Sequence, residues 1–196
     1  MKVYLAGPDV FLADAAAIGK RKKELCARFG LVGLFPLDSE MTEEGGKSLS
    51  LRIFRGNTAM MEEADAIIAN LTPFRGPSAD PGTIYELGFM AGQRKICFGY
   101  SNVSGTYLDK VLAHNPVQKD AQRARYVDKE GAAVEDFELP DNLMIVHALE
   151  EFGHPLVMPN SPLIDPSHDL GAFEICVRLL AERRARLTTT AHRHAL

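Results

Sequence analysis

The 196-residue sequence has few cysteines and no basic character. Its three cysteines, Cys26, Cys97 and Cys176, are odd in number and widely spaced, which argues against a disulfide framework and against a metal site. The formal net charge of -4 at pH 7 provides no electrostatic basis for binding a nucleic-acid polymer, because such binding normally requires a basic face. We therefore expect neither a disulfide-stapled scaffold nor a nucleic-acid-binding protein.

Long hydrophobic runs are absent as well. The apolar start of the chain is broken at Gly7 and Pro8, too early for a signal peptide. No run approaches the ~20 apolar residues that a membrane-spanning helix requires. These absences predict a cytoplasmic protein that does not engage a membrane.

The length and ordinary apolar content fit one compact domain whose core is large enough to be stable without disulfides or a structural metal. We expect this single domain to span residues 1–187. The remaining residues, 188–196, are polar and contain histidine, and they are predicted to form a flexible tail.

Strands and helices alternate along the first half of the chain. The predicted strands cover residues 3–6, 31–35, 66–71 and 96–100, and the predicted helices cover residues 15–29, 49–63 and 81–93. Alternation at these spacings indicates a parallel sheet covered on both faces. The sequence therefore predicts an α/β fold with a doubly wound, mostly parallel sheet, Rossmann-like or flavodoxin-like.

The first helix has a clear apolar side. Asp14 is a plausible N-cap, and the residues expected to face the core are Ala15, Ile18, Leu25 and Cys26. The basic run over residues 20–23 is expected to face water.

The pattern weakens over residues 101–140, which mix Gly, Asn, Pro and charged residues. We expect an insertion that lies over the sheet or forms an oligomer contact, with a short helix near Ala121 and a turn at residues 128–131. A helix over about residues 141–152 should follow, and then a final helix over about residues 170–186. The final helix should pack on the sheet through residues at helical spacing: Phe173, Cys176, Val177 and Leu180.

Residues 70–89 lead from a strand end through a Pro/Gly-rich loop into a helix with a carboxylate in its opening turns. Asp80 is well placed as the N-cap, and Pro81 suits the first helical position. Glu86 lies near the positive end of the helix dipole, which favours its ionised form. A surface glutamate is the alternative, but the long loop, the apolar flanks and the second carboxylate upstream favour a nucleophile at Glu86.

Polar residues follow each of the first three strands: Tyr4 and residues 7–9, then Asp38, then the loop before Glu86. The carboxyl edge of an open α/β sheet is where ligands bind, so these residues should converge. Neither a G-x-G-x-x-G fingerprint nor a phosphate-binding P-loop is present. An acid-rich site of this kind suits a neutral or cationic substrate, or a glycosidic centre, better than a dinucleotide.

Five motifs occur in order: YLAGP with VF (4–8, 10–11), FPLD (35–38), ADAIIANL (64–71), DPGTIYELG (80–88) and DNLM (141–144). Together they resemble the nucleoside 2-deoxyribosyltransferase family, over about three-quarters of the chain. The resemblance implies a cofactor-free transfer of 2-deoxyribose between nucleobases through a covalent sugar–enzyme intermediate. It also implies a homo-oligomer whose sites are shared between subunits, acting on deoxyribonucleosides and free nucleobases.

By this resemblance Glu86 is the nucleophile, Asp80 transfers the proton of the base, and Tyr4 steadies the nucleophile or the sugar. Asn142 and Met144 would come from a neighbouring protomer to bind the sugar hydroxyl and close the site. The other residues expected to contact substrate are Gly7, Asp9, Phe11, Asp38, Asn57 and Gly82. Asn57 stands where the family often has an aspartate, and Glu40 stands where it has a glutamine near the base.

Two alternatives stay open. A hydrolase could use the same glutamate and let water intercept the sugar, with a 5-phosphate held by groups such as Arg52, Arg55, Arg75 and Ser78. A non-catalytic nucleoside-binding module would bind ligand without forming product.

Overall fold

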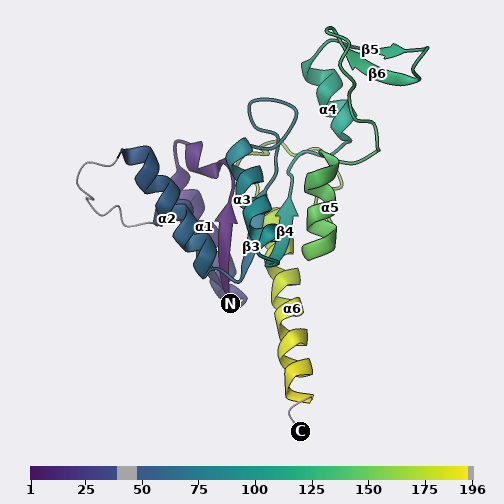
Figure 1. The fold of residues 1–196 in the computed structure, drawn as a ribbon. Coiled ribbons are helices and arrows are strands. Elements are labelled where there is room, and N and C mark those ends of the chain that lie inside the picture. Colours follow the sequence, from purple (N-terminus) through teal and green to yellow (C-terminus); the bar gives the residue numbers. More distant parts are fainter. Residues whose placement is uncertain (39–47, 194–196) are drawn as a thin grey trace.

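The computed structural model describes residues 1–38 and 48–193, and within them four strands form a parallel sheet in the order β2-β1-β3-β4 (Figure 1). The strands are β1 (Lys2–Ala6), β2 (Val32–Leu34), β3 (Ala66–Asn70) and β4 (Ile96–Tyr100). This order is that of a flavodoxin-like sheet, so the predicted α/β fold is confirmed. Its topological switch point lies between β1 and β3, because β2 pairs with β1 on the opposite side.

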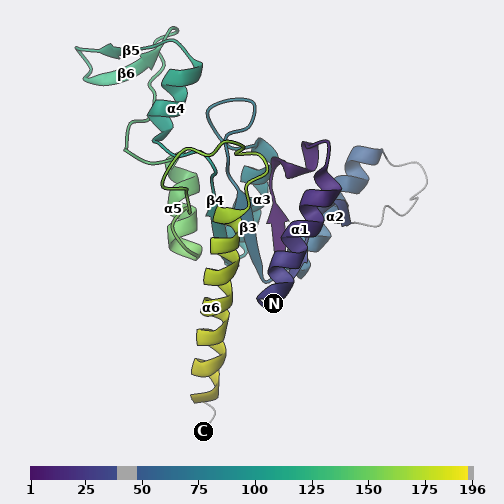
Figure 2. The same ribbon diagram turned by 180° about the vertical axis from the view of Figure 1, so that it is seen from behind.

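Helices cover both faces of the sheet, because alternate residues of each apolar strand point to opposite sides. Val3 and Leu5 of β1 pack in the core beneath α1 (Ala15–Arg28) and α6 (Gly171–Arg193), which Figure 2 shows in front of the sheet. On the other face, Tyr4 and Ala6 belong to a core that includes residues of α2 (Leu49–Glu63), α3 (Pro81–Gly92) and α5 (Leu143–Phe152). The expected packing of α6 through Phe173, Cys176, Val177 and Leu180 is confirmed.

Helix α1 departs from two predictions. Lys22 is buried, although the basic run at residues 20–23 was expected to face water. It lies one turn from Ile18 and from Cys26 on the inner face of the helix, and there it pairs with Asp9. Asp14 occupies the N-cap position without a capping hydrogen bond from its side chain, which instead contacts His168.

Two short 3-10 turns follow the first two strands, η1 (Pro8–Phe11) and η2 (Pro36–Asp38). Both lie at the carboxyl edge of the sheet, where the sequence predicts the site. Residues 39–47, which include Glu40, lie outside the described residues.

The segment after β4 projects from the body and does not lie over the sheet (Figure 1). It contains α4 (Tyr107–His114) and a hairpin of β5 (Val117–Asp120) and β6 (Arg125–Asp128). The helix expected near Ala121 is wrong, because that residue belongs to the tight turn between the strands of the hairpin. The turn at residues 128–131 is confirmed: the Gly131 N–H donates to the Asp128 carbonyl, with Gly131 at a φ of 83° that suits glycine.

Helix α6 continues to Arg193, past residue 187, where the sequence predicts that a flexible tail begins. Residues 188–193 contain no Gly or Pro to stop the helix, and the flexibility of the segment 188–196 stays a prediction. Among the described residues, no helix is long and apolar enough to cross a membrane.

Candidate active site

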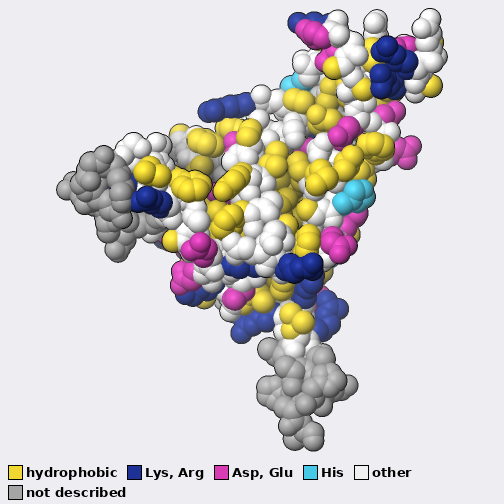
Figure 3. Space-filling view, in the orientation of Figure 1, with side chains coloured by type: hydrophobic (Ala, Val, Ile, Leu, Met, Phe, Trp, Pro, Cys, Tyr) yellow, Lys and Arg dark blue, Asp and Glu magenta, His cyan; other side chains and the backbone are white. Residues whose placement is uncertain are grey.

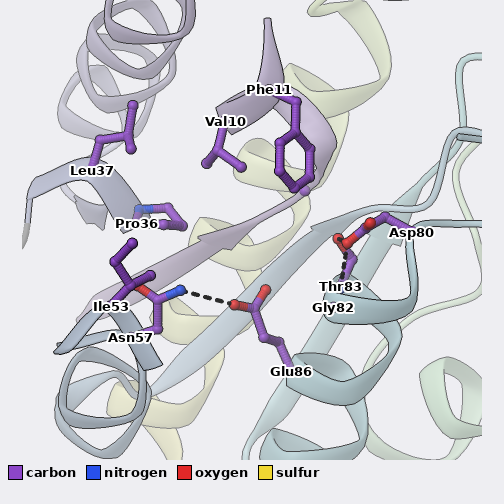
Figure 4. Close-up of a pocket in the computed structure, with 11 residues that line it drawn as sticks. Val10, Phe11, Pro36, Leu37, Ile53, Asn57, Asp80, Gly82, Thr83 and Glu86 are labelled. Atoms are coloured by element: carbon purple, nitrogen blue, oxygen red, sulfur yellow. Dashed lines mark hydrogen bonds between the residues drawn. The ribbon is translucent and has the colours of Figure 1, made fainter. Parts of the chain in front are cut away.

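A cavity of about 430 Å³ opens at the carboxyl edge of the sheet (Figure 4). Its walls come from the loop after β1, from η2, and from helices α2 and α3. The described lining residues are Gly7, Val10, Phe11, Pro36, Leu37, Ile53, Asn57, Asp80, Gly82, Thr83 and Glu86. Most are apolar, and the polar ones cluster on α2 and α3, which is the usual composition of a small-molecule site.

Glu86 lies at the centre of the polar cluster. The Tyr4 hydroxyl, at the middle of β1, donates a hydrogen bond of 2.6 Å to Glu86 Oε1. The Asn57 amide of α2 reaches the same oxygen from the other side, at 3.5 Å (Figure 4). Two elements distant in sequence therefore hold the carboxylate in one orientation.

Burial raises the pKa of Glu86 to about 7. The hydrogen bond from Tyr4 opposes that rise, the negative charge of Asp80 adds to it, and the hydrogen bond from Asn57 opposes it. The sequence suggests that the helix dipole favours the ionised form of Glu86, but Glu86 lies beyond the first turn of α3, where the dipole has weakened, and burial has the larger effect on its pKa.

Tyr4 is suited to act as a permanent donor. Burial, and then the charge of Glu86, hold the pKa of its phenol far above the usual range. Because the phenol keeps its proton, its hydrogen bond favours the ionised form of Glu86.

Asp80 caps α3 and lines the cavity at the same time. Its Oδ2 accepts hydrogen bonds from the Thr83 N–H at 2.9 Å and from the Thr83 hydroxyl at 3.2 Å. A Cβ at Gly82 would lie 3.0 Å from Asp80 Oδ2, so the absence of a side chain there leaves the carboxylate its place. Capping thus fixes a second carboxylate in the cavity lining, at the start of the helix that carries Glu86 (Figure 4).

Two residues that were predicted to contact substrate, Asp9 and Asp38, pair with lysines instead. Asp9 is buried, with Oδ2 at 2.7 Å from Lys22 Nζ. Asp38 accepts hydrogen bonds from Lys23 Nζ at 2.5 Å and from the Phe35 N–H at 3.0 Å. Both follow strand ends as expected, but lysines of α1 occupy their carboxylates, and neither lines the cavity.

The family model described as nucleoside 2-deoxyribosyltransferase matches residues 3–144, which include all of the elements that form the cavity. The chain belongs to the nucleoside 2-deoxyribosyltransferase family.

Similar proteins extend this result. A 2-desoxiribosyltransferase from Leishmania mexicana superposes with a TM-score of 0.61 at 27% identity, covering 90% of this chain and 97% of that one. A conserved protein from Enterococcus faecalis V583, at 17% identity and a TM-score of 0.53, shares the fold over 91% of this chain and 97% of that one. An uncharacterized protein from Schizosaccharomyces pombe is 34% identical over 139 residues, which are 68% of this chain and 66% of that protein, just under two-thirds of its length.

The two residues that the family resemblance assigns to a neighbouring protomer do not line this chain's own cavity. The Asn142 amide donates to Glu135 at 2.6 Å, and its oxygen accepts from the Met144 N–H at 3.0 Å, which caps α5. Met144 is 72% exposed. An exposed thioether beside a capped helix start is available to another molecule.

Part of the cavity wall was not predicted from the sequence. Val10, Pro36, Leu37 and Thr83 occur in the family motifs but were not assigned to the site, and Ile53 was not singled out. Ile53 is one of several apolar residues on this exposed part of α2, so the sequence carries no signal that distinguishes it.

The phosphate-binding groups considered for a hydrolase lie outside the cavity. Arg75 stacks over the rings of Phe11 and Phe74, at 5.3 and 4.7 Å from their centroids. The Ser78 hydroxyl donates to Asp141 at 2.7 Å. Among the described residues that line the cavity there is no Arg or Lys.

Proposed function

We propose that the protein transfers 2-deoxyribose between nucleobases through a covalent intermediate on Glu86, with net retention at the anomeric carbon. The observation that carries the proposal is the hydrogen-bonded Glu86 carboxylate in the cavity, with the Asp80 carboxylate in the same cavity lining at the start of α3. Membership of the nucleoside 2-deoxyribosyltransferase family supports the same reaction.

In the first step a Glu86 oxygen attacks the anomeric carbon of the bound deoxyribonucleoside. The bond from that carbon to the base nitrogen breaks, its electron pair goes to the base, and Asp80 supplies the proton that neutralises the base. Tyr4 and Asn57 hold the attacking carboxylate. A covalent step of this kind divides one difficult displacement into two easier ones.

In the second step the incoming base attacks the same carbon, and Glu86 leaves as a carboxylate. Asp80 takes the proton from the incoming base and is ready for another cycle. Each step inverts the anomeric centre, so a β-nucleoside gives a β-nucleoside, as in a retaining glycosidase. The absence of Arg and Lys from the described cavity lining favours free nucleosides over nucleoside monophosphates as donors.

A chromatographic assay with deoxyinosine, run with and without adenine, tests the proposal. Deoxyadenosine should form when adenine is present. Release of hypoxanthine and free deoxyribose at a rate unaffected by adenine would assign a hydrolase instead. Ligand binding without any product would assign a binding module.

The activity should fall on the acid side of neutrality. Only ionised Glu86 can attack, and its pKa of about 7 means that the acid limb of kcat/KM rises with pH through that value. Tyr4→Phe removes a hydrogen bond that lowers this pKa, so the acid limb should move to higher pH.

Measured pH profiles of the wild type and of Tyr4→Phe test this, with Tyr126→Phe on the distant hairpin as the control. An acid limb that stays at the same pH in Tyr4→Phe would contradict the assigned role of this hydroxyl.

We further propose a homo-oligomer in which each cavity is completed by Asn142 and Met144 of a neighbour. Exposed apolar side chains gather over α2 and α3 beside the cavity (Figure 3). The ring centroids of Phe54 and Tyr85 lie 6.4 Å apart there, and those of Tyr85 and Phe89 lie 6.3 Å apart. Such a patch on a protein surface is typical of an interface.

Subunit complementation tests the shared site. Glu86→Gln and Asn142→Ser should each be inactive as homo-oligomers, with serine preserving the cap of α5. Co-expressed, they form hybrid pairs in which one site has both native residues, so roughly a quarter of the wild-type activity should return if the two subunits pair at random. No recovery in hybrids isolated through a different affinity tag on each variant would place Asn142 outside the shared site.

A further inference from the structure

A buried ion pair lies directly behind one wall of the cavity. Lys22 Nζ is 2.7 Å from Asp9 Oδ2, and the two side chains are 2% and 3% exposed. The ammonium lies over the rings of Tyr100 and Phe173, at 5.5 and 5.2 Å from their centroids. A charge with this little access to water needs its partner, because an isolated buried charge is strongly disfavoured.

The pair continues into the loop after β3. The Asn70 amide donates to Asp9 Oδ2 at 3.1 Å, and Asn70 Oδ1 accepts from the N–H and the hydroxyl of Thr72 at 3.1 and 2.6 Å. The Thr72 hydroxyl in turn accepts from the Asn102 N–H at 3.0 Å. These contacts join α1, the loop after β1, and the ends of β3 and β4 in one buried network.

Gly7 leaves space for this network because it has no side chain. A Cβ at this position would lie 2.4 Å from Asp9 Oδ2 and 2.7 Å from Asn70 Cβ, closer than real contacts allow. Gly7 itself lines the cavity, and Asp9 belongs to η1, whose Val10 and Phe11 form the adjoining wall. The position of this wall therefore depends on where Asp9 is held.

We propose that Lys22 is a positioning residue of the substrate cavity, fixing through Asp9 the loop that holds Val10 and Phe11 against the nucleoside. The inference rests on the proposed function for the nature of the ligand. It concerns binding and not bond cleavage, since Tyr4 and Glu86 belong to other elements and Asp80 is held separately by Thr83.

Steady-state kinetics of Lys22→Met test the role, with Lys20→Met as the matched control on the exposed side of the same helix. Lys22→Met should raise KM for deoxyinosine by about tenfold while kcat changes less than about threefold, because substrate-contacting groups are displaced and reacting groups are not. The acid limb of the pH profile should be unchanged. A KM equal to that of Lys20→Met would overturn the proposal.

Lys22→Met leaves Asp9 buried without its partner and can prevent folding. The double variant Asp9→Asn, Lys22→Met contains no unpaired buried charge and keeps the core filled. It should fold, show the same rise in KM, and exchange the amide hydrogens of residues 9–12 faster than Lys20→Met does. Wild-type exchange together with wild-type KM would show that the pair serves stability alone.

The two proposals fail in different ways. If the proposed function is wrong, the wild type shows no Glu86-dependent turnover of deoxynucleosides. If the role of Lys22 is wrong, an active wild type and the double variant have the same KM, and the amide exchange at residues 9–12 is the same whatever the reaction.

Discussion

Substitution of Glu86 by glutamine is expected to lower the rate of deoxyribosyl transfer by on the order of 10⁴-fold or more, as for other enzymes that lose a nucleophile. Glutamine fits the same space and can still accept the hydrogen bond of Tyr4, so the cavity should keep its shape. The amide cannot form the glycosyl ester. Single-turnover transfer from deoxyinosine to adenine measures the loss, and Glu62→Gln on the exposed side of α2 is the control. Activity within tenfold of the wild type would exclude Glu86 as the nucleophile.

The same substitution should make the protein more stable at alkaline pH. The folded-state pKa of Glu86 is raised from 4.5 to about 7, so the ionised side chain opposes folding as pH rises between these values. The penalty is absent below pH 4.5 and complete above about pH 7. Removing the charge should therefore increase the free energy of unfolding by on the order of 2 kcal/mol at pH 8 and by little at pH 4.5. Equal gains at both pH values in chemical denaturation would contradict the raised pKa.

Substitution of Asp80 by asparagine is expected to lower kcat by about 10²–10⁴-fold, the usual contribution of a general acid. Asparagine is as good an N-cap as aspartate, so the start of α3 should be preserved. The loss then reports proton transfer and not a displaced helix. It should be large for hypoxanthine, which needs a proton to leave, and small for a p-nitrophenyl 2-deoxyriboside, whose leaving group departs as an anion.

The comparison of the two donors provides the internal control for Asp80→Asn. An equal loss with both donors would mean that Asp80 acts on the shape of the site. A change below about fivefold with deoxyinosine would remove Asp80 from the chemistry, since general acids contribute far more.

Local pattern was sufficient to predict the framework of the fold. The apolar strands and the helix α2 (Leu49–Glu63) were predicted closely because each has a strong periodicity and clear ends. The hairpin after α4 was missed because β5 and β6 are short, polar and largely exposed, so they carry no alternating apolar signal. The place of the site also followed from sequence, since parallel strands end at one edge of the sheet.

Individual side chains at that edge could not be predicted in the same way. Asp9 and Asp38 are found at the predicted strand ends, yet each carboxylate is taken by a lysine of α1. The basic run containing Lys22 suggested a solvated surface, whereas its spacing from Ile18 places it inside. Which lysine meets which aspartate depends on how α1 packs on the sheet, and a single sequence does not specify that packing.

The electrostatics of Glu86 show the same limit. Its place in α3 suggests help from the helix dipole, but the protein around it, from Tyr4 of β1 to Asn57 of α2, sets its pKa. Burial is a property of the assembled fold, and at this residue it has the larger effect.

The measurement that tests the central claim most directly is mass spectrometry of the intact protein, quenched in acid during turnover of deoxyinosine without an acceptor base. The protein should gain the mass of one deoxyribosyl group, and peptide mapping should place that group on Glu86. Adenine added before the quench should remove the group from the protein as deoxyadenosine. An active enzyme that remains unmodified throughout turnover, or that carries the sugar on another residue, would contradict the assignment of Glu86 as the nucleophile.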